Sequence, residues 1–274
     1  MPDEKIVYGL ILADDVLDPE KALEVAKAAA PYMDATKLTI SNCLKDLQLL
    51  SRVKKETGKP VIADSKVADI GFWNEKNRKW EGTNGKTVST LIDAGADYIT
   101  CQMFPGTSSI QECVEVAHSL GGKILTLPYM THRGADVFFD QPINLLYTKD
   151  KLESLGIAVD IKRCDTISDL ILVLGEYFKV DGYIGPANTP KKLIRYRQFT
   201  TKTIDGPGIG RQVIGDLTPQ KQLKIFYDTC GEDSGAIIGS AIYGSPKNPD
   251  LASVVGAAKT FRLWRDQICN DMYR

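Results

Sequence analysis

Three charged residues stand close together in the stretch "VIADSKVADIG" (61–71), directly behind an apolar run that predicts a buried strand: Asp64, Lys66 and Asp69. Burying charge without a partner is costly, so this setting indicates a paired arrangement. A lysine between carboxylates stays protonated, which makes Lys66 a proton donor and fixed cation rather than a Schiff-base nucleophile. A carboxylate facing a negative substrate group disfavours the ground state, and a cation beside a developing carbanion favours the transition state. The pattern therefore indicates decarboxylation or another reaction through a carbanion.

Two further charges follow neighbouring predicted strands. Asp15 closes the first strand in "LILADD", with Asp14 as a competing candidate, and Lys37 ends the second in "MDATKLTI". Because the carboxyl ends of barrel strands converge on one site, we expect one cluster. Its members are Asp15, Lys37, Asp64, Lys66 and Asp69. The alternative for such a cluster is a structural ion-pair network that stabilises the barrel.

The elements that must position these residues are alternating strands and helices. Eight apolar runs of strand length are found at 7–13, 35–40, 60–64, 97–102, 123–129, 182–186, 201–205 and 235–239. Continuous apolar runs suit strands covered on both faces. An N-cap residue followed by proline predicts helix starts at Asp18–Pro19, Thr189–Pro190, Thr218–Pro219 and Asn248–Pro249. The pattern predicts an α/β fold, a (β/α)8 barrel (TIM barrel) formed as one domain by residues 1–274. A doubly wound sheet is the alternative, but no GxGxxG follows the first strand.

Two segments interrupt this alternation. Residues 71–82 separate the third strand from its helix, and residues 136–165 delay the helix after the fifth. Both insertions are expected on the C-terminal face, where barrels build their sites. Trp73 and Trp80 in the first insertion are expected to pack rather than to bind substrate.

Composition excludes several classes of partner and cofactor. Lys+Arg number 34 and Asp+Glu 35, so there is no broad electrostatic reason to expect nucleic acid or an anionic membrane. The six cysteines are scattered and predict buried free thiols, which fits a reducing compartment. Two histidines supply zinc chemistry poorly. The acidic N-terminus does not resemble a signal peptide, and no apolar run would cross a bilayer. We therefore expect a cytoplasmic protein.

An anion site is expected on the loops after the last two strands. "DGPGIGRQ" (205–212) follows the seventh strand and "GSAIY" (239–243) the eighth. These loops commonly form the phosphate site of a barrel from backbone N–H groups. Gly208, Gly210 and Gly239 would permit close approach of an anion to the backbone.

The motif "ADSKVADIG" resembles the DxKxxDI signature of the orotidine 5′-monophosphate decarboxylase family. Further segments are similar to the family in the same order: "LILADD", "YMDATKL", "DAGADYITCQMFPG", "YMTHRGA", "YIGPANTP", "PGIGRQ" and "IIGSAIY". The resemblance implies a (β/α)8 barrel that works as a homodimer on a nucleotide substrate, without metal or cofactor. The wider superfamily also contains hexulose-phosphate synthases, and the isoleucine after the second aspartate favours the orotidylate branch.

The resemblance also implies roles for individual residues. Lys37, Asp64, Lys66 and Asp69 would form the catalytic network, with Lys66 protonating the carbanion left when CO2 departs. Asp15 and Lys37 would hold ribose hydroxyls, and Thr131 would contact the pyrimidine. The residues expected to reach the partner subunit's site are Asp69, Ile70 and Thr83, and those expected to line the base and phosphate region are Pro207, Gln212 and Gly239.

One departure from the family concerns the phosphate. The family normally has an arginine after the glycine of strand eight, where this sequence has Ser240. A hydroxyl replaces a bidentate guanidinium poorly, so we expect Arg211 to supply the charge from the neighbouring loop. Two alternatives stay open: a Mg2+-dependent sugar-phosphate enzyme of the superfamily, and a barrel that binds a nucleotide without turnover.

Overall fold

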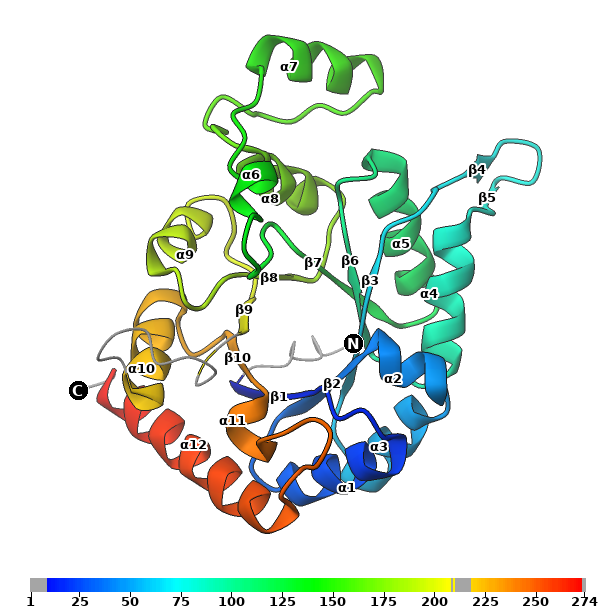
Figure 1. Cartoon of the computed structure of the whole chain (residues 1–274). Helices are drawn as coiled ribbons and strands as arrows, with labels where there is room; N and C mark the ends of the chain where they lie inside the picture. The colour runs from blue at the N-terminus through cyan, green and yellow to red at the C-terminus, as the bar shows by residue number, and fades with distance from the viewer. Residues whose placement is uncertain (1–8, 208, 210–217, 273–274) are drawn as a thin grey trace.

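The computed structural model describes residues 9–207, 209 and 218–272. In this part of the chain, eight parallel strands close into a barrel with the neighbour order β1-β10-β9-β8-β7-β6-β3-β2. Helices surround the barrel, as Figure 1 shows. The predicted (β/α)8 fold is therefore confirmed.

The barrel strands are β1 (Gly9–Asp14), β2 (Ala35–Thr39), β3 (Val61–Val67), β6 (Tyr98–Cys101), β7 (Lys123–Thr126), β8 (Gly182–Ile184), β9 (Ile204–Pro207) and β10 (Gly235–Ile238). The helices are α1 (Pro19–Ala29), α2 (Ile40–Lys45), α3 (Leu49–Thr57), α4 (Thr83–Asp93), α5 (Thr107–Ser119), α6 (Asp136–Phe139), α7 (Leu145–Ser154), α8 (Ile167–Tyr177), α9 (Pro190–Tyr196), α10 (Pro219–Cys230), α11 (Ser240–Tyr243) and α12 (Leu251–Asp271).

Side chains alternate between two cores along each strand. The inner core fills the barrel and consists of Ile11, Ala13, Ala35, Ile62, Tyr98, Leu125, Leu127, Ile184 and Ile237. The intervening residues, such as Leu10, Leu12 and Leu38, pack outward against the helices. Most strands thus carry apolar side chains on both faces, which explains the largely apolar runs in the sequence.

All eight predicted strands are found, and strand seven differs most from its prediction. The prediction was 201–205, whereas β9 begins at Ile204. Thr200 Oγ1 accepts a hydrogen bond from Lys202 N, at 3.0 Å, and this turn delays the strand.

The predicted helix starts are correct at three positions. Proline occupies the first turn of α1, α9 and α10, and Asp18 and Thr218 cap α1 and α10 through their side chains. The prediction at Asn248–Pro249 was wrong, because Asp250 caps α12 by accepting from Ala252 N and Ser253 N. Pro249 instead pairs with Gly244 in an isolated bridge.

Both insertions follow the carboxyl ends of barrel strands, as predicted. Within residues 71–82, β4 (Trp73–Asn74) and β5 (Lys79–Trp80) form an antiparallel hairpin that projects from the barrel in Figure 1. Trp73 and Trp80 pack edge to face with ring centroids 5.4 Å apart, which confirms their expected packing role. Residues 136–165 contain α6 and α7, and the delayed helix is α8.

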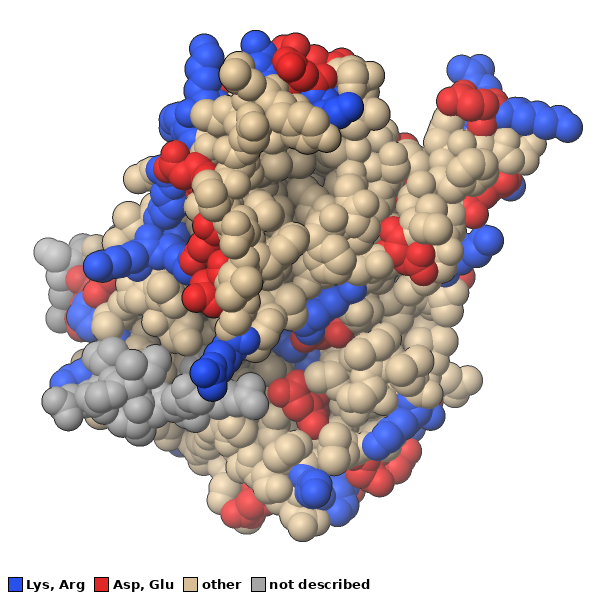
Figure 2. All heavy atoms as spheres, turned by 45° about the horizontal axis from the view of Figure 1, so that its top comes forward, with Lys and Arg blue, Asp and Glu red and all other residues tan. Residues whose placement is uncertain are grey.

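Acidic and basic side chains lie beside one another on the face that Figure 2 shows, without one dominant patch of either sign. This matches the formal net charge of −1. Among the helices described, none has the length and apolar character needed to span a membrane.

Candidate active site

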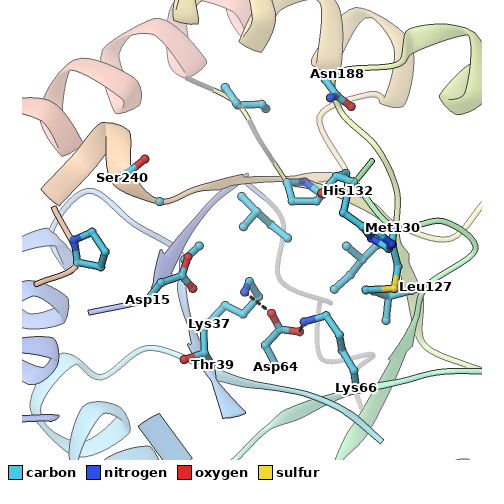
Figure 3. Close-up of a pocket in the computed structure, with 18 of the residues that line it drawn as sticks. Asp15, Lys37, Thr39, Asp64, Lys66, Leu127, Met130, His132, Asn188 and Ser240 are labelled. Carbon is cyan, nitrogen blue, oxygen red and sulfur yellow. Dashed lines mark hydrogen bonds and ion pairs between the residues drawn. The ribbon is translucent and has the colours of Figure 1, made fainter. Parts of the chain in front are cut away.

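A cavity of about 720 Å³ opens at the carboxyl ends of the barrel strands (Figure 3). This size suits a ligand as large as a nucleotide. Its lining combines charged and polar groups with an apolar floor, and consists of Ala13, Asp15, Lys37, Thr39, Asp64, Lys66, Leu127, Tyr129, Met130, Thr131, His132, Ile184, Asn188, Pro207, Ile209, Ile237, Gly239, Ser240, Tyr243 and Pro246.

Strand alternation decides which acidic residue of the first strand faces the cavity. Ile11 and Ala13 point into the barrel, and the next residue on that side is Asp15. Asp14 is fully buried outside the cavity lining, and burial raises its pKa to about 8. The structure therefore favours Asp15, the first of the two candidates from the sequence.

Asp64 lies between two lysines, which approach it from opposite sides in Figure 3. Lys37 Nζ is 2.5 Å from Asp64 Oδ2, and Lys66 Nζ is 2.8 Å from Asp64 Oδ1. Burial alone would raise the pKa of Asp64, but Lys37 and Lys66 outweigh it and hold that pKa well below its usual range. The Asp64 carboxyl group is thus ionised at neutral pH, and it lies at the bottom of the cavity.

The charge of Lys37 is secured by the same interaction. Burial of this side chain would lower its pKa, yet attraction to Asp64 and Asp15 outweighs burial and raises it. Lys66 is more open, with 37% of its side chain exposed against 8% for Lys37. Of the two ammonium groups, that of Lys66 is therefore the more accessible to a ligand.

The backbone of Lys66 has an unusual conformation. Its φ is +49°, a left-handed value that costs a residue with a side chain roughly 1–2 kcal/mol. The pairing of β3 with β6 also shifts here, because Ala63 pairs with Ile99 while Val67 pairs with Cys101. Three residues of β3 (64–66) thus oppose a single residue of β6, a bulge of the kind found next to active sites.

Within one chain, Asp69 does not join the other four charged residues. The expectation that all five would form one cluster was therefore wrong for Asp69. Asp69 is exposed, and it is not among the residues lining the cavity. Its backbone is held by the buried side chain of Asn84, which accepts from Asp69 N at 3.0 Å and donates to Asp69 O at 2.8 Å. The chain turns outward after β3 toward the hairpin, carrying Ile70 (68% exposed) away from the cavity as well. Thr83, at the start of α4, is also exposed outside the cavity.

The remaining predicted residues divide into two groups. Thr131, Pro207, Gly239 and Ser240 line the cavity as expected for ligand contacts. Arg211 and Gln212 lie outside the described residues, so their place is not described.

Several lining residues were not selected from the sequence. Thr39 follows Lys37 by two positions on the same strand face, and alternation could have found it. Asn188 lies in the loop after β8, within the segment "YIGPANTP", and Tyr129 and Met130 precede Thr131 after β7. Loops after barrel strands carry site residues, but nothing in their composition says which side chain turns inward.

The geometry suits stabilisation of negative charge at one carbon. An anionic substrate group placed beside Asp64 would be repelled, while Lys66 offers a proton and a positive charge at the same place. The apolar side chains of Leu127, Ile184 and Ile237 line the same cavity and reduce its access to water. In the described part of the chain, no group of three or more His, Cys, Asp or Glu is arranged to hold a metal ion.

The fold and site define a (β/α)8 barrel with a Lys–Asp–Lys network at the carboxyl ends of its strands. The sequence model of the orotidine 5′-phosphate decarboxylase / HUMPS family matches residues 9–253, so the chain belongs to this family. Orotidine 5′-phosphate decarboxylase of Thermococcus kodakarensis is 35% identical over 247 residues, covering 89% of this chain and 92% of that protein. The Methanococcus maripaludis (strain S2) protein of the same name is 29% identical over 258 residues, covering 93% and 95%.

A solved structure agrees with these sequence comparisons. The crystal structure of orotidine 5′-monophosphate decarboxylase from Methanocaldococcus jannaschii, complexed with inhibitor BMP, superposes with a TM-score of 0.71 at 26% identity. The match covers 95% of this chain and all of that one.

Proposed function

We propose that this protein is a carboxy-lyase that converts orotidine 5′-phosphate to UMP and CO2 in pyrimidine biosynthesis. The observation that carries the proposal is the alternating row Lys37–Asp64–Lys66 at the bottom of a nucleotide-sized cavity. Family membership and the names of the relatives support the same reaction.

Each charged residue then has a role that follows from its position. Asp64 repels the substrate carboxylate, which lowers the barrier to its loss as CO2. Lys66 stabilises the carbanion and donates its proton to it, because its ammonium is both accessible and held by Asp64. Lys37 keeps Asp64 ionised, and Asp15 and Lys37 hold the ribose hydroxyls.

The phosphate is assigned to the loops after β9 and β10. Pro207, Gly239 and Ser240 line this part of the cavity, and Ser240 supplies a hydroxyl where the family has an arginine. Arg211 supplies the missing charge, with Gln212 beside it. Arg211→Ala should weaken UMP binding far more than uridine binding, because only UMP carries the phosphate. If UMP binding and uridine binding weaken equally, Arg211 does not bind the phosphate.

The active form is a homodimer in which each subunit completes its partner's site. The supporting observation is that the segment directly after Asp69 exposes large apolar side chains, with Ile70 68% and Phe72 53% exposed. Patches of this kind mark interaction sites on soluble proteins. Asp69, Ile70 and Thr83 of one subunit reach the cavity of the other.

Mixing two inactive variants tests this sharing. Lys66→Ala and Asp69→Ala each damage both sites of their own homodimer, but a mixed dimer has one site with both residues intact. Mixed dimers should therefore regain activity that neither variant shows alone. Failure to regain it, with exchange of subunits demonstrated, would place Asp69 in its own chain's site or outside the site.

A turnover assay separates this function from its alternatives. Orotidine 5′-phosphate absorbance should fall on adding the protein in EDTA, because no step of the proposed reaction uses a metal. Loss of activity with EDTA that Mg2+ restores would favour the sugar-phosphate branch of the superfamily. UMP binding without any turnover would favour a nucleotide-binding barrel.

The proposed location is the cytoplasm. All six cysteines are buried free thiols, which fits a reducing compartment.

A further inference from the structure

The bulge that carries Lys66 is closed by one side chain of the neighbouring strand. Thr100 is the residue of β6 that lies opposite residues 64–66, between the pairs Ala63–Ile99 and Val67–Cys101. Tyr98 belongs to the inner core and Ile99 and Cys101 to the outer one, so alternation directs the Thr100 side chain into the barrel.

The hydroxyl of Thr100 uses both of its hydrogen-bonding functions within this bulge. Its Oγ1 accepts from Lys66 N at 2.9 Å and donates to Asp64 Oδ1 at 3.0 Å. Lys66 Nζ returns to the same Oδ1 at 2.8 Å, which closes a ring through the backbone and side chain of Lys66. Figure 3 shows the Asp64–Lys66 part of this ring facing the cavity.

Thr100 itself does not touch the ligand space. Its exposed fraction is 0%, and it is absent from the residues that line the cavity. Any effect of Thr100 on a reaction must therefore pass through Asp64 and Lys66.

The ring explains how a left-handed lysine persists in a strand. A backbone conformation of this kind lasts only where its surroundings determine it, and the Lys66 N–H would otherwise be an unpaired donor inside the bulge. We propose that Thr100 is a positioning residue, whose hydroxyl fixes the Asp64–Lys66 bulge and so aims the Lys66 ammonium at the reacting carbon. This inference rests on the proposed decarboxylase function and extends it to a residue outside the cavity.

The test removes the hydroxyl and keeps the shape of the side chain. Thr100→Val should lower kcat roughly 10- to 100-fold, the scale expected when a catalytic group is displaced by about 1 Å. UMP affinity should stay within about threefold of wild type, because the remaining cavity is intact. Thr100→Ser restores the hydroxyl and should return kcat to within about threefold of wild type.

Thr126→Val is the matched control. Thr126 is a fully buried threonine in the next strand, β7, and its hydroxyl donates to Cys101 O at 2.9 Å without contacting the charged residues. Its loss should leave kcat within about twofold of wild type. If Thr100→Val does not fold, Thr100→Ala removes the hydroxyl without added bulk. The same fall in kcat and the same UMP affinity are then expected of Thr100→Ala.

Three results would overturn the inference: a Thr100→Val kcat within about twofold of wild type, an equal loss in Thr126→Val, or no recovery in folded Thr100→Ser. A crystal structure of Thr100→Val separates this inference from the function. If wild type does not turn over orotidine 5′-phosphate, the proposed function fails. The crystal structure then decides alone, since a moved Lys66 supports the positioning role and an unmoved Lys66 refutes it.

Discussion

Replacing Asp64 by asparagine removes the one charge that lies between two lysines. The Lys37 side chain is only 8% exposed and would keep Asp15 as its chief opposite charge. Leaving a buried charge without its partner costs about 3–5 kcal/mol in free energy of unfolding. For a chain of this size the loss corresponds to a fall in Tm of roughly 6–20 °C.

The pH dependence of this loss has a definite sign. In wild type the pKa of Lys37 is raised, so its contribution is full below the unfolded pKa of about 10.4 and is lost only above it. Burial is the largest single influence on the pKa of Lys37, so we expect it to dominate once the attraction of Asp64 is removed. The pKa of Lys37 in Asp64→Asn should then fall below its unfolded value. The variant therefore gains stability as pH rises from this lowered pKa to about 10.4. The difference from wild type should be widest near neutral pH and should shrink toward about pH 10.

Urea unfolding followed by circular dichroism, at a series of pH values, measures this difference. Asp228→Asn is the control, because Asp228 forms an exposed i,i+4 pair with Lys224 and should change stability by less than about 0.5 kcal/mol. If Asp64→Asn is as stable as wild type at neutral pH, or its deficit stays constant with pH, the account of the buried network is refuted.

Two further predictions concern parts of the chain away from the charged network. Burial raises the pKa of Asp205 to about 7, above its unfolded value of about 4. The folded protein is therefore most stable below about pH 4, and it loses stability as pH rises to about 7 and the buried carboxyl group ionises. Asp205→Asn should therefore gain stability relative to wild type between pH 4 and 8, by on the order of 4 kcal/mol; a pH-independent difference in urea unfolding would contradict this. A Cβ at Gly82 would lie 2.2 Å from Glu112 Oε2 and 2.5 Å from Ile70 O, so Gly82→Ala should cost about 1–3 kcal/mol. Gly256, in α12, is the control: a Cβ there meets no atom within 4 Å, so Gly256→Ala should stabilise the protein by about 0.5–1 kcal/mol. Equal Tm shifts for Gly82→Ala and Gly256→Ala would show that the base of the hairpin is not tightly packed.

Hydrophobic pattern and strand alternation predicted the parts of the molecule that depend on local sequence. Each barrel strand was visible as an apolar run. Lys37 and Asp64 were expected at or near strand ends and lie within β2 and β3, but strand alternation still directs both into the cavity. Counting from Ile11 and Ala13 also selects Asp15 over Asp14, because the strand stays regular up to that point.

Long-range contacts set the features that the sequence could not give. Asp69 follows Lys66 by three residues, yet a buried asparagine fifteen residues later turns its backbone away from the cavity. The role of Thr100 was invisible because it depends on a bulge in another strand. Side chains on the loops after β7 and β8, such as Asn188, are placed by the fold rather than by a periodic pattern.

The most direct test of the central claim compares CO2 release from orotidine 5′-phosphate by wild type and Lys66→Ala in EDTA. UMP binding to both proteins provides the check that the cavity has formed. If Lys66 donates the proton, the variant should bind UMP and release CO2 at least about a hundredfold more slowly than wild type. Release at the wild-type rate by Lys66→Ala would contradict the assignment of Lys66 as the catalytic acid.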